Sequence, residues 1–310
     1  MAGKIFGQAG NRELGMFIPP ARRHRQSQRW CYRALALGFA WIVALPVGSA
    51  LALEPPAQAA QPQTYFFLVF NSPVRGREAE YNLWYNHQHA PDVVSVPGFV
   101  SAQRYELNAI QLRAVALKKP KYLVLYEIRT DDLPAVIAEV KRRLSTGQTK
   151  ISPALDPASG EMYLYRQFRP TVPGAGGQPV NAKPGGLRHY LQVVFGDAAA
   201  GQDQAFNTWY DQDHEPSLLA GAGFVSARRG LISETQMVPI PDPSKYLALF
   251  EIRTSDLAAV FSQKFQGSEP PPAFDRARTF GYTYRAIGPK ILGDAVRAQR
   301  SRAHRSTATP

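Results

Sequence analysis

Short apolar runs alternate with amphipathic segments along the chain, and the whole pattern occurs twice. In the first copy, the apolar runs predict strands, and two longer segments with helical periodicity predict helices. The predicted strands lie near 65–70, 98–107, 121–129 and 161–168, and the predicted helices near 77–95 and 131–144. The order strand, helix, strand, strand, helix, strand is that of a ferredoxin-like module, in which two helices cover one face of an antiparallel sheet.

The predicted strands are apolar on both faces. In KYLVLYEI, which begins at Lys121, one face carries Tyr122, Val124, Tyr126 and Ile128, and the other carries Leu123, Leu125 and Glu127. An antiparallel sheet with one face in water would alternate apolar and polar residues instead. We therefore expect an α+β protein in which the sheets of the two copies cover each other and the helices lie outside, so that one chain forms an internal pseudo-dimer.

The repeat includes polar positions as well as apolar ones. The segment NLWYNHQHAPDVVSVPGFVSAQRY begins at Asn82, and NTWYDQDHEPSLLAGAGFVSARRG begins at Asn207, 125 positions later, with eleven of the 24 positions identical. We place the copies at 65–168 and 188–288, and the Pro- and Gly-rich segment 169–187 as the linker between them. Each copy is then of normal domain size.

The first 53 residues have the features of an export signal. Residues 34–53 carry no charged side chain and follow several arginines. Ala50 and Ala52 have the spacing of a signal-peptidase site, so we expect a mature chain from near Leu53, a linker over 54–64, and a periplasmic or secreted location. An uncleaved membrane anchor is the alternative, because the apolar run is long enough to span a bilayer. The sole cysteine, Cys31, lies in this segment, which fits an oxidising compartment.

The positive charge of the chain is concentrated at its ends. The formal net charge is +12, but residues 1–53 carry seven basic and one acidic side chain, and residues 289–310 carry five and one. The intervening part is nearly neutral and offers no electrostatic footprint for DNA or RNA. We expect the tail 289–310 to be solvated and disordered rather than a binding arm.

The first helix of each copy carries the candidate chemistry. Its shared-face residues are Asn82, Tyr85 or Asn86, and His89 in the first copy, and Asn207, Tyr210 and His214 in the second. Pro91 and Pro216 are expected to end or bend the helix just past each histidine. Each histidine would then lie at a helix C-terminus, where the macrodipole favours the protonated imidazole, and could act as a general acid or base. The alternative is a histidine that caps the helix and packs on an aromatic neighbour.

Further candidate substrate contacts recur in both copies: Trp84 and Trp209 on the helices, and Arg104 and Arg229 on the second strands. The tryptophans are expected to fill the core, or at most to form cleft walls. The arginines recur together with Glu127 and Glu251 on the neighbouring strands, which favours a cross-strand ion pair. The alternative is that each arginine anchors a carboxylate or enolate of a substrate.

The two copies also differ. Tyr105 of the first copy is replaced by Gly230 in the second, which leaves open whether one or both clefts are active. The hairpin loops 108–120 and 233–244 are longer than tight hairpins require, so they are either candidate lids or simple insertions.

The run of Asn, Trp and Tyr, then His four residues after the Tyr, then Pro and a PGF-like turn into a strand, resembles the EthD-like branch of the dimeric α/β-barrel superfamily. The resemblance covers both copies, and it implies an intramolecular dimeric α/β barrel in a monomeric chain. It also implies a ligand cleft between helices and sheet in each half, with His89 or His214 facing it. The superfamily includes cofactor-free cyclases, dehydratases, isomerases and quinone-forming monooxygenases, as well as haem-handling proteins.

Other chemistries lack their motifs. There is no phosphate-cradling glycine loop and no nucleophile elbow, and His87 and His89 lie two positions apart on a helix, where they cannot face one metal. We therefore expect no metal and no cofactor, with haem bound through His89 or His214 as the alternative. The predicted function is an exported lyase, dehydratase or isomerase that acts on an apolar aromatic or polyketide-like molecule by histidine acid–base catalysis. A non-catalytic protein that binds haem or a hydrophobic ligand, and a structural scaffold, are the alternatives.

Overall fold

The computed structural model describes residues 61–112, 120–175 and 186–307. The first half contains β1 (Gln63–Asn71), α1 (Glu78–Trp84), α2 (Ala90–Val94), β2 (Phe99–Leu107), β3 (Tyr122–Thr130), α3 (Leu133–Ser145) and β4 (Glu161–Gln167). The second half contains β6 (Arg188–Ala198), α4 (Asp203–Trp209), α5 (Glu215–Leu219), β7 (Phe224–Ile232), β8 (Tyr246–Thr254), α6 (Leu257–Phe261) and β9 (Phe274–Leu292). The short strand β5 (Val172–Pro173) lies between the halves, and α7 (Gly293–Thr307) follows β9. The predicted signal at 1–53 and most of the linker at 54–64 lie outside the described residues.

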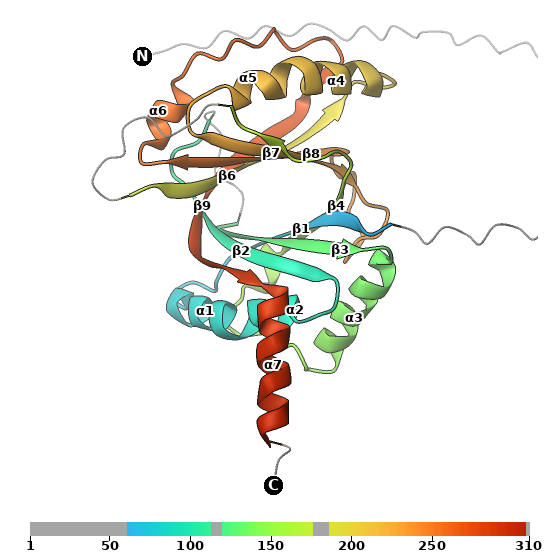
Figure 1. Ribbon diagram of the computed structural model, residues 1–310, viewed down its shortest axis with the longest axis vertical. Coiled ribbons are helices and arrows are strands. Elements are labelled where there is room, and N and C mark those ends of the chain that lie inside the picture. The colour runs from blue at the N-terminus through green and yellow to red at the C-terminus, as the bar shows by residue number, and fades with distance from the viewer. Residues whose placement is uncertain (1–60, 113–119, 176–185, 308–310) are drawn as a thin grey trace, which may run out of the picture. The chain divides into compact units, whose positions relative to one another are not determined.

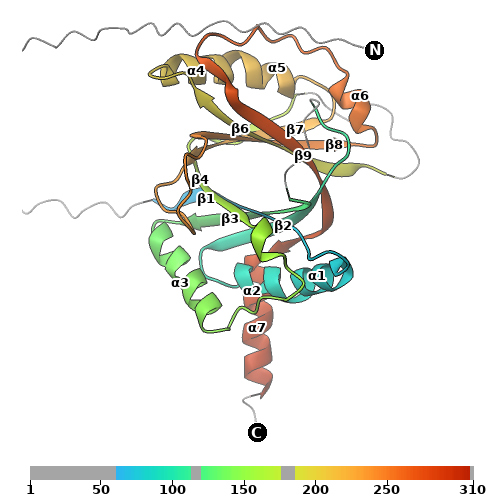
Figure 2. The same ribbon diagram turned by 180° about the vertical axis from the view of Figure 1, so that it is seen from behind.

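All strands belong to one antiparallel sheet that closes on itself. The order is β4-β1-β3-β2-β9-β6-β8-β7-β5, and β4 also pairs with β7, so the eight longer strands form a barrel. The halves meet edge to edge, through β2 with β9 and through β4 with β7. Figures 1 and 2 show the helices of the two halves on opposite outer sides of this barrel. The predicted α+β class and closed barrel are confirmed.

Both faces of the strands are buried, as the sequence predicts, because they contribute to different cores. Tyr122, Val124 and Tyr126 pack under the helices of the first half. Leu123 and Leu125 point into the barrel, where they meet interior residues of both halves. The second half has its own helix–sheet core. The barrel interior is therefore the surface that holds the halves together, since burial of apolar side chains is the main driving force of association.

The first helix of each half changes its winding in the middle. A π-helical turn occupies Tyr85–His89 between α1 and α2, and a second one occupies Tyr210–His214 between α4 and α5. Pro91 and Pro216 lie in the first turn of the α-helices that follow, where a proline needs no donor. The helix therefore continues past each histidine, and the expectation of a helix C-terminus there is wrong. Single π-turns of this kind are frequent at functional sites.

The repeated glycine after this helix is required by the backbone. Gly98 and Gly223 have φ values of +95° and +91°, which L side chains rarely adopt. A Cβ atom at either position would also lie 2.9 Å from a methyl group of Val136 or Val260. The turn can therefore bring the chain from the helix into β2 or β7 only with glycine.

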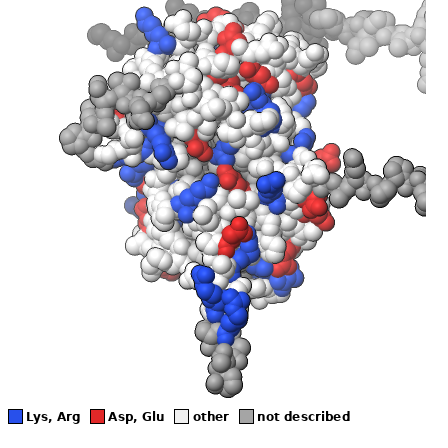
Figure 3. Space-filling model, viewed as in Figure 1, with Lys and Arg blue, Asp and Glu red and all other residues white. Residues whose placement is uncertain are grey.

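The tail expected to be disordered from residue 289 is ordered. β9 pairs with β2 as far as Leu292, and α7 continues to Thr307. Arg297 donates to the backbone oxygens of Val94 and Phe99, at 2.9 and 3.1 Å, and Arg300 pairs with Asp92. The arginines that we interpreted as solvated charge thus attach the helix to the first half. Figure 3 shows basic side chains gathered on α7, while acidic and basic side chains are mixed over the rest of that face.

The second helical layer differs between the halves. The helix α3 has 13 residues, whereas its counterpart α6 has five and is followed by an irregular segment, residues 262–273. This segment lies against the first helix of the second half, since the backbone N–H of Ser268 donates to Asp213 at 2.8 Å. In the part of the chain that the structure describes, no helix is long and apolar enough to cross a membrane.

Candidate functional site

A buried arginine lies between helix and sheet in each half. In the first half, Arg104 is 3% exposed and donates to the side-chain oxygens of Asn82 (2.9 Å) and Asn86 (2.5 Å). The Asn82 amide donates to the Tyr122 hydroxyl at 3.1 Å, and that hydroxyl donates to Glu78. The helical face predicted from the spacing of Asn82 and Asn86 thus exists, and it is directed at the arginine.

The second half repeats this network with a carboxylate in it. Arg229 is 1% exposed and donates to Asn207 at 2.9 Å and to Asp211 at 2.5 Å. The Asn207 amide donates to the Tyr246 hydroxyl (3.0 Å), which donates to Asp203 (2.6 Å). Asp211 stands where the first half has Asn86. Arg229 thus forms an ion pair with Asp211, where Arg104 donates to a neutral amide.

Aromatic rings surround both guanidinium groups. The guanidinium carbon of Arg104 lies 4.6 Å from the centre of the Tyr85 ring, and that of Arg229 lies 4.1 Å from the centre of the Tyr210 ring. These distances fall within the range of cation–π attraction, which is strongest for a desolvated cation. The structure therefore brings the separately predicted candidates Tyr85 and Arg104 together, and likewise Tyr210 and Arg229.

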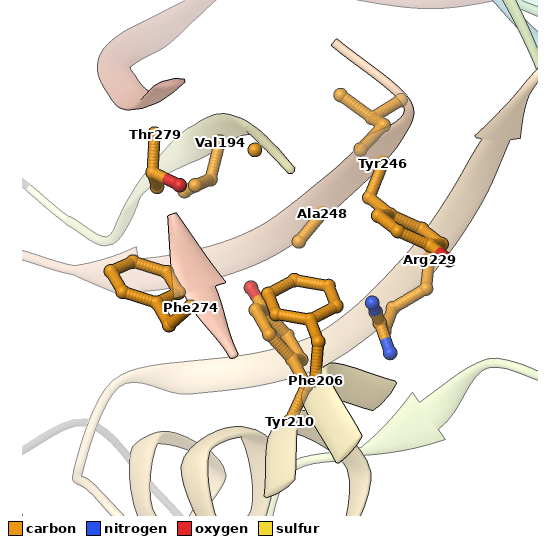
Figure 4. Close-up of a pocket in the computed structure, with 10 residues that line it drawn as sticks. Val194, Phe206, Tyr210, Arg229, Tyr246, Ala248, Phe274 and Thr279 are labelled. Atoms are coloured by element: carbon orange, nitrogen blue, oxygen red, sulfur yellow. The ribbon is translucent and has the colours of Figure 1, made fainter. Parts of the chain in front are cut away.

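A small cavity lies beside the arginine of the second half. It has a volume of about 10 Å³, enough for about one water molecule. Its walls include Phe206, Tyr210, Arg229, Tyr246 and Phe274. Figure 4 shows these side chains converging on one space from α4, the neighbouring turn and three strands. The site is thus mostly apolar, with one cation and two phenol groups.

Differences at four equivalent positions account for the cavity. The first half has Tyr81, Asn71, Val124 and Tyr126 where the second half has Phe206, Gly196, Ala248 and Phe250. Tyr81 donates a hydrogen bond to Asn71, and both side chains are buried. Each replacement in the second half removes atoms, and three of the smaller residues line the cavity: Phe206, Gly196 and Ala248. The first half is filled at this place by its own side chains, while the second half keeps a void of about one water molecule.

The Tyr210 hydroxyl is the polar group best placed to meet a ligand in the cavity. It is buried, and no protein group that the structure describes hydrogen-bonds to it. Burial raises the pKa of Tyr210, while the nearby Arg229 charge lowers it by less. The phenol therefore stays protonated at neutral pH and can donate a hydrogen bond or a proton to a bound oxygen atom.

The predicted histidines lie beside the cavity wall rather than in it. The His89 ring lies 4.6 Å from the Trp84 ring and 4.9 Å from the Tyr85 ring, and His214 lies 4.8 and 4.9 Å from Trp209 and Tyr210. Trp84 and His89 are five residues apart, so the π-turn, and not α-helical spacing, brings them together. Neither histidine lines the cavity of the second half.

The charge state of His89 differs from the expectation. Burial lowers the pKa of His89 to about 4, and the nearby Arg104 charge acts in the same direction, while a hydrogen bond with the Lys150 backbone opposes them. The macrodipole was expected to favour the protonated ring, but the helix does not end at this residue. His89 is therefore neutral at neutral pH and could accept a proton, not donate one.

The two tryptophans face the outer connections. The Trp84 ring N–H donates to the backbone oxygen of Lys150, and the Trp209 ring N–H donates to the Ser268 hydroxyl, both at 3.1 Å. Trp84 belongs to the core of the first half, and Trp209 packs at the edge of the second. Neither tryptophan lines the helix–sheet cavity, although Trp84 and His87 line a separate surface pocket of about 440 Å³ in the first half.

The expected ion pairs between neighbouring strands are wrong. Arg104 is opposite Val124 and points towards the helix, whereas Glu127 is opposite Ser101 and points into the barrel. Glu127 and Glu251 both form ion pairs with Arg228. This arginine occurs in the second copy only, since the first copy has Gln103 at the equivalent position. Glu127 lies three positions from Val124, the residue opposite Arg104. Since side chains alternate between the faces of a strand, Arg104 and Glu127 lie on opposite faces of the sheet.

Sequence analysis missed a buried charged cluster next to Arg229. Glu215 is fully buried, burial raises its pKa, and its carboxylate lies 3.4 Å from Arg169, which also pairs with Asp211. The first copy has Ala90 and Asn86 at the positions of Glu215 and Asp211. The two acidic residues that appear only in the second copy were therefore a signal in the sequence. A carboxylate in a buried position needs a positively charged partner, so they could have predicted a buried ion pair.

The helix–sheet cavity does not fit a haem bound through His89 or His214. Within the described residues, no group of three or more His, Cys, Asp or Glu side chains could hold a metal ion. A haem needs a cavity of several hundred Å³, roughly the lower end of the usual range for ligand pockets, beside a histidine nitrogen. The helix–sheet cavity of about 10 Å³ is far smaller, and neither His89 nor His214 lines it.

Comparisons with known proteins find likeness in structure alone. In sequence, the chain matches no family model and no curated protein. Similar solved structures include an anthrone oxidase-like protein (12% identity, TM-score 0.48, covering 76% of this chain and 95% of the other). A monooxygenase-like protein of Fusobacterium nucleatum has 9% identity and a TM-score of 0.45, with 75% and 95% covered. Chlorite dismutase of Candidatus Nitrospira defluvii has 15% identity and a TM-score of 0.38, with 76% and 94% covered. Function has to be argued from the site itself.

Proposed function

We propose that this protein is an exported small-molecule enzyme of the lyase, dehydratase or isomerase type, with its site in the helix–sheet cleft of the second half. The observation that supports the proposal most directly is the contrast between the clefts: one is filled by Tyr81 and Asn71, and the other is hollow at the same place. A hollow costs packing energy, so its presence in one copy favours a ligand there.

The substrate class follows from the cavity walls. Phe206, Tyr246 and Phe274 offer ring faces and edges to an apolar molecule, as in other small-molecule sites. The polar groups are donors: the Tyr210 hydroxyl and the Arg229 guanidinium. The site therefore suits an aromatic or polyketide-like molecule that presents a carbonyl, enol or phenol oxygen to these two groups.

The two donors define the proposed chemistry. Arg229 cannot lose its proton, and it stabilises negative charge that develops on the substrate oxygen. Its Nε–H is buried and has no hydrogen-bond partner among the described residues. The raised pKa of Tyr210, caused first by burial, keeps the phenol protonated and suits it as a hydrogen-bond donor to that oxygen. Stabilisation of an enol or enolate oxygen in this way needs no redox cofactor.

His214 has a supporting place in this proposal. Its ring packs on Trp209 and on the edge of Tyr210, so it fixes the orientation of the phenol ring. We propose that it acts through Tyr210 and does not contact the substrate. A His214→Phe variant should then keep the pH profile of the reaction, whereas loss of a basic limb from that profile would make the histidine the acid–base group.

Substrate entry requires the cavity to widen. Phe274, the first residue of β9, follows segment 262–273, which forms no regular strand or helix and is attached to the first helix of the second half by the bond from Ser268 to Asp213. We propose that this wall moves outwards when a ligand enters.

A binding screen tests the proposal with a matched pair of variants. Thermal unfolding of the full-length chain is followed with a panel of aromatic and polyketide-like compounds, in the parent and in Tyr210→Phe and Tyr85→Phe. We expect a compound that stabilises the parent and Tyr85→Phe, but stabilises Tyr210→Phe less, and that is turned over by the parent. Equal losses in both variants, or loss in Tyr85→Phe alone, would place the site elsewhere.

A further inference from the structure

A second pocket opens at one end of the barrel and shares no lining residue with the helix–sheet cavity. It has a volume of about 240 Å³ and is lined by the rings of Tyr163, Phe195 and Phe280, from β4, β6 and β9. The Phe195 ring lies 5.3 Å from each of the other two rings. Residues 240–244, which belong to the connection between β7 and β8, form its rim. We call it the mouth pocket. Aromatic walls and this volume suit a planar molecule of one or two rings.

An arginine at the rim is held by two carboxylates of different kinds. Arg278 donates from Nε to Asp197 at 2.7 Å, and from its two terminal nitrogens to Asp242 at 2.5 and 3.0 Å. Asp197 is buried and also accepts from the backbone N–H of Lys245 at 2.6 Å, so it is part of the framework. The Asp242 side chain is 78% exposed and has Arg278 as its ion-pair partner. Of the two carboxylates, exposed Asp242 is thus the one that a ligand could replace on Arg278.

The backbone at Asp242 is unusual in the same place. Its φ is 44°, the one positive value found at a non-glycine position in the described part of the chain. Pro241 and Pro243 flank it and restrict the segment further. Side chains held in this left-handed region cluster at ligand clamps, and exposed ion pairs contribute little to stability. The segment therefore holds a carboxylate on Arg278 at some conformational cost and for little gain in stability.

We propose that the mouth pocket binds a planar aromatic carboxylate, with its rings against Phe195 and Phe280 and its carboxylate in place of Asp242 on Arg278. Planar bidentate recognition of a carboxylate is the geometry for which arginine is best suited. Asp242 is then an internal competitor that occupies the cation while the pocket is empty. The 233–244 loop, which the sequence marked as a candidate lid, carries this competitor. The site is independent of the proposed reaction in the helix–sheet cleft.

Calorimetric titration of the full-length chain with 2-naphthoate and with its neutral analogue 2-naphthamide tests the site. We expect the parent to prefer the carboxylate. Asp242→Asn, which removes the competitor from an exposed loop, should bind 2-naphthoate tighter by up to about fivefold, the limit set by the strength of an exposed ion pair. Arg278→Gln should lose the preference for the carboxylate over the amide.

Two further variants assign the location. Phe280→Ala should weaken both probes, and Tyr210→Phe in the helix–sheet cavity should weaken neither. The proposal is overturned if the parent binds the two probes alike, if neither the parent nor Asp242→Asn binds 2-naphthoate, or if Asp242→Asn leaves its affinity unchanged. A loss of binding in Tyr210→Phe would assign the probe to the helix–sheet cavity and would also overturn it.

Discussion

The Tyr81 hydroxyl donates a hydrogen bond to the buried Asn71 side chain, and the equivalent residues of the second half, Phe206 and Gly196, cannot make this bond. The pair fills the cleft of the first half. Because both partners of this bond are lost together, neither of the two positions is left with an unsatisfied group in the second half, which helps the cavity there to be tolerated. The first repeat thus has a packed core where the second has a small cavity.

Removal of one partner should be costly in the first half. Tyr81→Phe leaves the Asn71 side chain buried without its donor, so we expect a loss of about 1–3 kcal/mol in the free energy of unfolding. Denaturant unfolding measures this loss. In the double variant Tyr81→Phe with Asn71→Gly, which copies the second half, part of the loss due to the unsatisfied amide should be recovered. If the double variant loses as much free energy of unfolding as the two single variants together, the two side chains are not coupled and the prediction is wrong.

Replacement of Asp211 by asparagine should be mild. The first half already has Asn86 at this position, and that amide accepts from Arg104 at 2.5 Å. Since Asp211 is 30% exposed, we expect Asp211→Asn to cost less than about 1 kcal/mol. Arg229→Met, which leaves carboxylates near a buried apolar residue, should cost about 3 kcal/mol or more. Chemical denaturation of both variants checks the difference, and equal losses would refute this account of the network.

His89 should make stability depend on pH in a mildly acidic range. Its pKa is lowered from 6.5 to about 4 in the folded protein, chiefly by burial. Between these values the unfolded chain binds a proton that the folded chain does not, so stability falls as pH drops from 6.5 towards 4. The full effect is roughly 3 kcal/mol at most. His89→Phe, which keeps the ring stack, should flatten the dependence over this range in urea titrations, and an unchanged slope would show that His89 is accessible to protons.

Glu251 should contribute a second dependence at lower pH. The His189 ring nitrogen, 3.6 Å from the carboxylate, and the charge of Arg228 lower the pKa of Glu251 from 4.5 to about 2, against the effect of burial. The stabilisation is complete above 4.5 and is lost as pH falls through about 2, with a total of roughly 3 kcal/mol at most. Circular dichroism during acid titration should show a shallower loss between these values in Glu251→Gln. A parallel transition in parent and variant would remove Glu251 from this account.

Much of the barrel could be predicted from the sequence, because its signals are local or repeated. The two-sided apolar strands, such as 121–129, require a cover on each face, and the second copy supplies one of them. The repeat of the same pattern then leads to a closed barrel. The edge pairing of β2 with β9 follows only from the three-dimensional twist of the strands, which no local pattern encodes.

The candidate site was predicted less completely. Tyr210 and Arg229 were predicted as substrate contacts, and the structure brings them together. The π-turns place the histidines against Trp84 and Trp209 instead. A π-turn inside a helix leaves no signal in the spacing of apolar residues, so the sequence could not predict this placement. The tail was misjudged for a similar reason. Its arginines look solvated in the sequence, and only the fold shows the carbonyl groups of α2 and β2 to which Arg297 donates.

The most direct test of the central claim is to fill the second cleft with the first half's own side chains. Phe206→Tyr with Ala248→Val restores the Tyr and Val of the first half, and ligand-dependent thermal stabilisation is measured for the compound that best stabilises the parent. The account predicts a folded variant that the compound no longer stabilises or reacts with. A variant that responds as the parent does would contradict a site in this cleft.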